Sequence, residues 1–281
     1  RTLTVDQTLT WTGGLMGGTG VTLIATQAIL SIEGAGRKDL TERILRNAGS
    51  VSWIGAGPLF AGLGARIENL ADALVNLRAE ARINALPGGP IAEIVNDGVF
   101  VKATNTVANA ANPFVIEIGF LNRNLVQVAR AGFSVSTNTL FLAGPFRNFV
   151  NQTLTGGRYL VQGTLQWVNA ANWTNAADLV LDGLNGVPGP NLRSELNADL
   201  LRTLLGNAPT GRLTLLNGHV FAPSRDFANQ GEFVAEQDSG LTLRNMTWAN
   251  SGRIQWNSTR SLAGTTATLN NLPSGIVEFT T

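Results

Sequence analysis

The chain has 281 residues, 44% of them hydrophobic, which is enough material for one large core or two smaller ones. Its net charge of +1, with basic and acidic residues mixed along the sequence, gives no reason to expect nucleic acid or an anionic membrane as a partner. The absence of cysteine excludes disulfides and thiolate metal sites, and the absence of any run of about 18 apolar residues argues against membrane insertion.

The first part of the chain predicts short strands separated by turns. Apolar residues alternate with polar ones, as at Leu9 and Trp11. The sequence holds 32 glycines and many asparagines, the residues that most readily adopt left-handed backbone angles at turns. Asp39 to Leu45 is compatible with a short helix or a loop. We therefore expect an all-β protein whose chain changes direction often.

An Asn-x-Gly motif followed by an apolar residue recurs along the chain. Its copies place asparagine and glycine at Asn47 and Gly49, Asn96 and Gly98, Asn229 and Gly231, and Asn250 and Gly252, while a further copy has Asn122 and Asn124. Asparagine is the commonest non-glycine residue at positive φ, so the swap at Asn124 predicts a structural turn with positive φ immediately before a strand.

The spacing of these motifs predicts a repeating coil. Asn229, Asn250 and Asn271 are 21 residues apart, and Trp11 and Trp53 are separated by twice that distance. Short strands, a repeated turn and a fixed period are typical of a parallel β-helix, or β-solenoid, in which each coil stacks on the previous one. We expect a single solenoid over residues 1–281, with coils of about 21 residues.

Two further segments carry a helical pattern. Leu70 to Ile83 fits both helix and strand, and the motifs on either side favour strand. Residues 192–208 place Leu192, Leu196, Leu200 and Leu204 four apart, which predicts an amphipathic helix after Pro188-Gly189-Pro190. This helix is either an insertion packed on the solenoid or a linker, in which case a domain boundary lies near 185–191.

The polar residues show no catalytic pattern. Acidic residues are scattered, and we expect Asp97, Asp178, Asp182 and Glu232 to cap turns or strand ends. Glu232, Arg253 and Ser274 share the period and predict a surface row, and His219, the only histidine, fits a turn. We therefore predict a protein that is not an enzyme, with no catalytic, cofactor-binding or metal-binding residues and no cofactor.

The six tryptophans mostly occupy apolar positions of predicted strands, so we expect them to pack in the core. Trp173, in Asn172-Trp173-Thr174, is the best candidate for an exposed ring and for a contact with a glycan.

Three longer blocks carry a family resemblance. They are W-T-G-G-L-M-G-G-T-G-V-T-L from Trp11, R-I-L-R-N-A-G-S-V-S-W from Arg43, and F-R-N-F-V-N-Q-T-L-T-G-G-R-Y-L-V-Q-G-T-L-Q-W from Phe146. With their continuations over 9–102 and 146–281, they resemble the repeat of large secreted bacterial proteins of the filamentous-haemagglutinin and autotransporter-passenger type. The chain departs from that pattern at Ala103–Pro113 and at 192–208.

The resemblance implies a right-handed parallel β-helix at the cell surface or released from it, serving as an adhesin, matrix component or stalk. We accordingly expect a non-enzymatic structural or adhesive segment with an extracellular or cell-surface location. Both ends look like processing points without a polar cap, so the expected partners are further coils of a longer precursor or other copies stacked end to end into a filament. The alternative is a carbohydrate-binding or polysaccharide-degrading β-helix, with surface glycans as partners.

Overall fold

The chain winds into a parallel β-solenoid in the computed structural model, which describes residues 1–103, 113–130, 138–183 and 191–280. These residues make about 11 turns of about 23 residues each. Their one helical element is a 3-10 turn, η1 (Leu200–Thr203). Within the described ranges, therefore, no helix has the length that a bilayer crossing requires.

The contacts group the chain into two compact units. The first contains Arg1–Arg147 and Leu165–Val168, and the second contains Asn148–Thr164 and Asn169–Thr281. The boundary expected near 185–191 for a linker helix lies almost wholly outside the described residues.

Each full coil of the first unit has three strands, one on each of three faces. The first face is made of β1 (Thr2–Val5), β4 (Gly20–Ile24), β7 (Arg43–Asn47), β10 (Arg66–Asn69), β13 (Glu93–Asn96) and β16 (Gly119–Asn122). The second is made of β2 (Thr8–Trp11), β5 (Ile29–Ile32), β8 (Ser50–Trp53), β11 (Leu74–Leu77), β14 (Val99–Lys102) and β17 (Leu125–Val128). The third is made of β3 (Gly14–Met16), β6 (Lys38–Thr41), β9 (Leu59–Gly62), β12 (Arg82–Ala85), β15 (Phe114–Ile116), β18 (Thr139–Leu142) and β21 (Thr164–Trp167).

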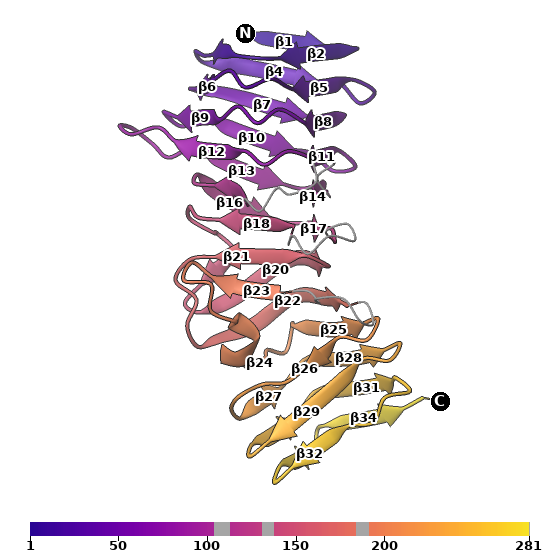
Figure 1. Cartoon of the computed structure of the whole chain (residues 1–281). Helices are drawn as coiled ribbons and strands as arrows, with labels where there is room; N and C mark the ends of the chain where they lie inside the picture. Colours follow the sequence, from indigo (N-terminus) through magenta and orange to yellow (C-terminus); the bar gives the residue numbers. More distant parts are fainter. Residues whose placement is uncertain (104–112, 131–137, 184–190, 281) are drawn as a thin grey trace. The chain divides into compact units, whose positions relative to one another are not determined.

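Equivalent strands of this unit lie directly under one another, as β1, β4, β7 and β10 do in Figure 1. Parallel in-register pairing therefore builds columns of inward side chains. Trp11, Ile32 and Trp53 occupy one such column on three successive coils, and all three are buried. The prediction that the two tryptophans lie two coils apart is confirmed. Burial of these large side chains supplies the main stabilisation, at about 25 cal/mol for each Å² of apolar surface removed from water.

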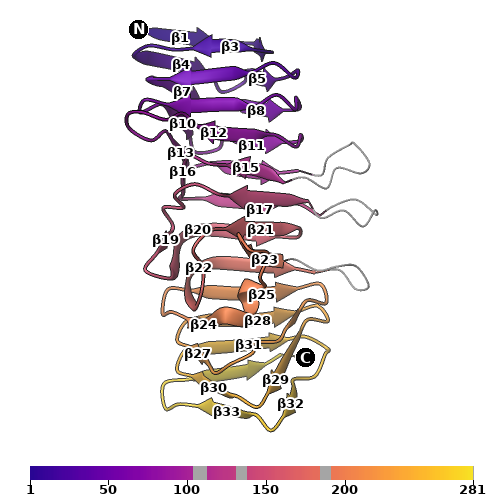
Figure 2. The same ribbon diagram turned by 60° about the vertical axis from the view of Figure 1, so that its left-hand side comes forward.

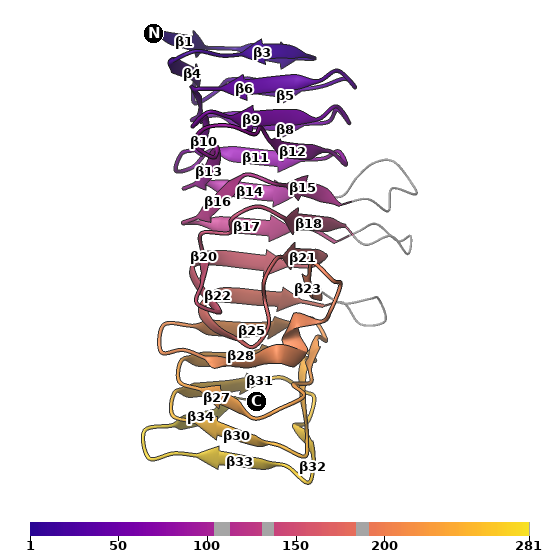
Figure 3. The ribbon, with the colours of Figure 1, turned by 90° about the vertical axis from the view of Figure 1, so that its left-hand side faces the viewer.

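The second unit starts with longer strands and then resolves into regular coils. Its first strands are β19 (Phe149–Val150), β20 (Thr153–Val161), β22 (Trp173–Asp182) and β23 (Asn191–Ser194). One face then holds β24 (Leu204–Asn207), β27 (Phe227–Asn229), β30 (Thr247–Asn250) and β33 (Thr268–Asn271). The next holds β25 (Arg212–Leu216), β28 (Glu232–Glu236), β31 (Arg253–Asn257) and β34 (Ile276–Phe279). The last holds β26 (Val220–Phe221), β29 (Gly240–Arg244) and β32 (Ala263–Thr265). Figures 2 and 3 show β27, β30 and β33 stacked in this order.

The coils vary in length more than the sequence suggested. Asparagines at one corner are separated by 22, 27 and 26 residues in the first unit and by 32, 22, 21 and 21 in the second. Other coils are slightly shorter, with 19 residues from Val5 to Ile24 and 20 from Arg212 to Glu232. The strand register shifts in the pairings of β22 with β20 and with β24, where the coils are irregular.

The predicted helix over 192–208 is wrong. Leu192 lies in β23, Leu200 and Leu201 lie in η1, and Leu204 lies in β24, and all four are buried. Leu196, between them, is 85% exposed. The four-residue spacing reflects a strand–turn–strand path in which each strand must pair with a neighbouring coil, and this pairing overrides the local helical preference.

Two shorter segments are also strands. Asp39 to Leu45 is neither helix nor loop, because it contains parts of β6 and β7. The strand interpretation of Leu70 to Ile83 is confirmed, since β11 and the start of β12 lie there. The stretch Ala103–Pro113 falls almost entirely outside the described residues.

Candidate functional site

A column of buried asparagines runs along one corner of each unit. Members of the first unit end consecutive strands of one face: Asn47, Asn69, Asn96 and Asn122. Members of the second unit are Asn175 in β22, followed by Asn207, Asn229, Asn250 and Asn271 at the ends of β24, β27, β30 and β33. All of them except Asn271 are buried. Such a continuous polar column inside a core requires every amide to be hydrogen-bonded.

In the first unit the first three amides each donate to the asparagine of the next coil. Asn47 Nδ2 donates to Asn69 Oδ1 at 2.8 Å, and Asn69 Nδ2 donates to Asn96 Oδ1 at 2.7 Å. Asn96 Nδ2 continues to Asn122 Oδ1 at 2.8 Å. The amides also donate to main-chain oxygens, as Asn47 does to Leu74 O at 3.0 Å. The column therefore satisfies its own amides. It also forms hydrogen bonds to the first residue of a strand on the next coil, such as Leu74 in β11.

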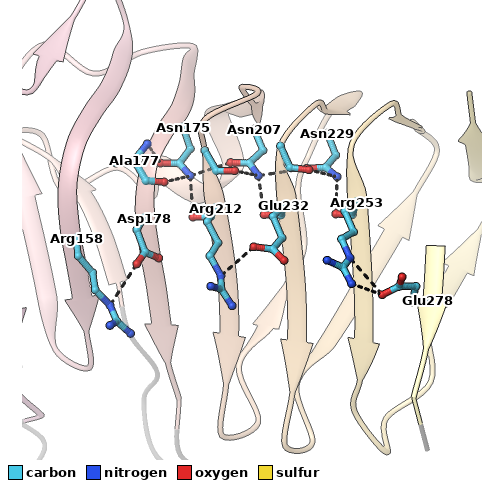
Figure 4. Close-up of polar contacts among 12 residues, drawn as sticks. Arg158, Asn175, Ala177, Asp178, Asn207, Arg212, Asn229, Glu232, Arg253 and Glu278 are labelled. Atoms are coloured by element: carbon cyan, nitrogen blue, oxygen red, sulfur yellow. Dashed lines mark hydrogen bonds and ion pairs between the residues drawn. The ribbon is translucent and has the colours of Figure 1, made fainter. Parts of the chain in front are cut away.

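The second unit repeats this arrangement over five members, three of which are labelled in Figure 4. Asn175 donates to Asn207 at 2.8 Å and Asn207 to Asn229 at 3.2 Å. Asn229 then donates to Asn250 at 2.8 Å, and Asn250 to Asn271 at 2.7 Å. Every donor points towards the later coil, so the column has a single direction within this unit.

The prediction of positive φ at these turns is wrong. Residues 47, 49, 96, 98, 122, 124, 229, 231, 250 and 252 are all absent from the positions with positive φ, which occur instead at other turns such as Asp72 (φ 64°) and Asn217 (φ 51°). Asparagine is needed at the first position of the motif because its amide both donates and accepts. Asn124, in the glycine position, donates Nδ2 to Asp97 O at 3.2 Å.

Close packing between coils explains the glycines. A Cβ on Gly49 would lie against the carbonyl oxygens of Ala25 and Ala28, far inside van der Waals contact. On Gly231 it would meet the carbonyl oxygens of Gly211 and Ala208 in the same way. The motif therefore records a close approach of two main chains and not a left-handed turn.

A row of alternating charges runs along the outside of the second unit (Figure 4). Arg158, Asp178, Arg212, Glu232 and Arg253 occupy equivalent positions on neighbouring strands. Ion pairs join Arg158 to Asp178 and Arg212 to Glu232, both at 3.3 Å. Arg253 contacts Glu278 at 2.7 Å, and this hydrogen bond lowers the pKa of the Glu278 carboxyl.

Cross-coil contacts also replace the capping roles expected for the acidic residues. Asp97 pairs with Arg123 at 3.4 Å, on the next coil of the first unit. Asp182 accepts hydrogen bonds from Gln162 and Asn217, both at 2.6 Å. The predicted row is confirmed for Glu232 and Arg253, which are in register. It is wrong for Ser274, which lies in the turn before β34, so that Ile276 is in register with Arg253.

The prediction that Trp173 is exposed is wrong. Its side chain is fully buried, and Nε1 donates to Leu200 O at 2.7 Å. A ring without exposed surface cannot stack on a glycan. The other five tryptophans are also buried, as expected.

The two lysines of the chain point inwards. Lys38 Nζ donates to Gly36 O at 2.9 Å, and Lys102 Nζ donates to Ala103 O at 3.2 Å. Burial lowers the pKa of both, that of Lys102 to about 8 against an opposing effect of Glu80. Burial also lowers the pKa of His219 to about 4, and this residue directly follows the turn at Asn217-Gly218.

An open recess of about 570 Å³ lies on the side of the second unit. Its lining comes from the η1 turn, the segment after β26 and the end of β29: Asp199, Arg202, Ala222, Pro223, Ser224, Thr242 and Arg244. No sequence pattern identifies this group in advance, because the lining residues come from three coils with unequal spacing. Across the described residues, no three of histidine, aspartate and glutamate gather closely enough to hold a metal ion.

The comparisons with known proteins give no family for the chain. No protein-family model matches it, and no curated protein and no solved structure is significantly similar. Of the expectations from the family resemblance, the parallel solenoid alone is shown.

Proposed function

We propose that the chain is a non-enzymatic structural or adhesive segment of a secreted or cell-surface bacterial protein. The observation that supports this proposal is the use of its polar side chains. The asparagine columns and the cross-coil ion pairs connect one coil to the next along each unit. Side chains used in this way stabilise stacking.

The ion pairs support the same role. At least nine arginines form ion pairs with carboxylates of the described residues, and most of these pairs join neighbouring coils, as Arg46 and Glu68 do at 2.7 Å. Each exposed pair contributes little to stability by itself, but such pairs favour one alignment of neighbouring coils.

We also propose that further coils, from the same protein or from a second copy, add through the pairing that already joins the coils. Each strand pairs in parallel with the equivalent strand of the next coil, as β28 does with β31. A coil added in this way would form the same main-chain hydrogen bonds.

Two measurements test the proposal. Antibodies against the chain should label intact source cells or their matrix, and labelling only after lysis would overturn the location. Incubation with a panel of neutral and acidic polysaccharides should release no new reducing ends or unsaturated products, whereas depolymerisation would favour the alternative of a polysaccharide-degrading β-helix.

A further inference from the structure

The recess in the second unit exists because one face lacks part of a strand. β26 has two residues, which pair with Gly240 and Leu241, while β29 continues to Arg244. Residues 242–244 pair with β32 on one side, and no described strand lies on the other. Pro223 follows closely after β26, and its lack of an N–H prevents the ladder from continuing there.

Two arginines border this gap without an anionic partner. Arg202, from η1, and Arg244, from the end of β29, are both exposed. Among the described residues, neither guanidinium forms an ion pair or a side-chain hydrogen bond, although Arg158, Arg212 and Arg253 of the same unit all pair with carboxylates. Guanidinium groups bind carboxylates with two parallel hydrogen bonds, so the recess is suited to an anion of that shape.

The other polar groups are suited to hydroxyls. Asp199 accepts a hydrogen bond from Leu201 N at 3.0 Å through Oδ1, which fixes the carboxylate and leaves Oδ2 as an acceptor. Thr242 contributes a half-buried hydroxyl. Ser224 Oγ donates to Arg202 O at 2.7 Å and so holds the segment after β26 against η1.

We propose that this recess binds a carboxylated sugar, that is, a uronic acid unit of an acidic polysaccharide. Arg202 and Arg244 bind the carboxylate, and Asp199 and Thr242 bind ring hydroxyls. A volume of about 570 Å³ lies within the usual range of small-molecule sites and accepts one or two sugar rings. The site is independent of the structural role proposed above, since it uses none of the residues in the columns or ion pairs.

Calorimetric titration of the whole chain with tri-galacturonate tests this proposal. We expect binding that weakens as salt concentration rises, and little binding of the same trisaccharide after its carboxyls are reduced to alcohols. Arg202→Gln and Arg244→Gln should each weaken binding at least tenfold, because each removes a charge-assisted contact. Arg253→Gln removes an equal charge on a different face and should change the dissociation constant less than twofold.

Four results would overturn the proposal: no binding at millimolar sugar, equal binding of the reduced trisaccharide, equal weakening by Arg253→Gln, or equally tight binding of an acidic peptide, which would indicate a general anion site. If a variant fails to fold, amide chemical-shift changes in the unmodified chain decide the question. They should cluster at residues 199–202, 224 and 242–244 on addition of tri-galacturonate, and changes elsewhere alone would contradict the assignment.

Discussion

The second unit carries two polar rows along the same coils, one buried and one exposed, and Figure 4 shows them side by side. Asn229 has no exposed surface, whereas the side chain of Arg253 is 46% exposed. Both rows provide contacts between neighbouring coils. Water competes for the ion pairs of the exposed row but cannot reach the hydrogen bonds of the buried row. Burial therefore decides how much each contact contributes to stability, and the neutral amide row outweighs the charged one.

The first unit shows what the buried row adds. In its first two coils the corner position is occupied by Val5 and Ile24, which are in register with Asn47. Ile24 is fully buried there, so an apolar side chain also builds the corner. Unlike isoleucine, a buried asparagine needs a hydrogen-bond partner at one defined position on the neighbouring coil. We infer that the asparagines fix the register of successive coils.

The largest effect on stability should come from adding a methyl group beside the buried row, where two coils approach most closely. In Gly231→Ala the added methyl group would collide with the carbonyl oxygens of Gly211 and Ala208, which are main-chain atoms of the preceding coil. We expect a loss of about 3 kcal/mol or more in the free energy of unfolding. Denaturant unfolding followed by tryptophan fluorescence measures it.

Gly264→Ala is the matched control, because its nearest non-neighbour atom, Ala267 Cβ, is 3.9 Å away. This substitution should leave stability nearly unchanged. Equal losses for the two variants would show that close approach of the coils does not explain the motif.

Removal of one amide from the buried row should have the next largest effect. Asn229→Ala deletes the donor to Asn250 Oδ1 and to Arg253 O and the acceptor for Asn207. Because the remaining groups stay buried, we expect a loss of about 2–3 kcal/mol. Asn271→Ala removes an exposed member of the same row and should cost less than about 1 kcal/mol in the same denaturant titration. Similar losses would refute the role of burial.

The buried lysine of the first unit, Lys102, extends the comparison. Burial lowers the pKa of Lys102 from 10.5 to about 8, so the folded chain binds this proton less tightly than the unfolded chain does. Between pH 8 and 10.5 the unfolded state holds more protons, and stability should rise with pH. Lys102→Met should add about 2 kcal/mol at pH 7 and remove that rise. An unchanged pH profile in the variant would contradict this explanation.

The sequence predicted the solenoid because strand periodicity and the repeated Asn-x-Gly motif are local features. It also placed Trp11 and Trp53 correctly in one column. The interpretation of the motif was wrong, because positive φ is a local explanation. The chain of amides from Asn207 to Asn271 and the crowding at Gly231 arise only when coils are stacked. The prediction that Trp173 is exposed was wrong for the same reason, because its burial depends on Leu200, 27 residues later.

The smallest effect should come from the exposed row. Glu232→Gln keeps the shape of the side chain but removes its charge between Arg212 and Arg253. We expect a loss of less than about 1 kcal/mol at low salt, because exposed pairs are screened by water and ions. The loss should fall further in 0.5 M salt, where the Debye length is roughly 4 Å. Unfolding of this variant and of Asn229→Ala should be compared at both salt concentrations. Only the loss in Glu232→Gln should depend on salt, and an equal dependence in both would remove the distinction between the two rows.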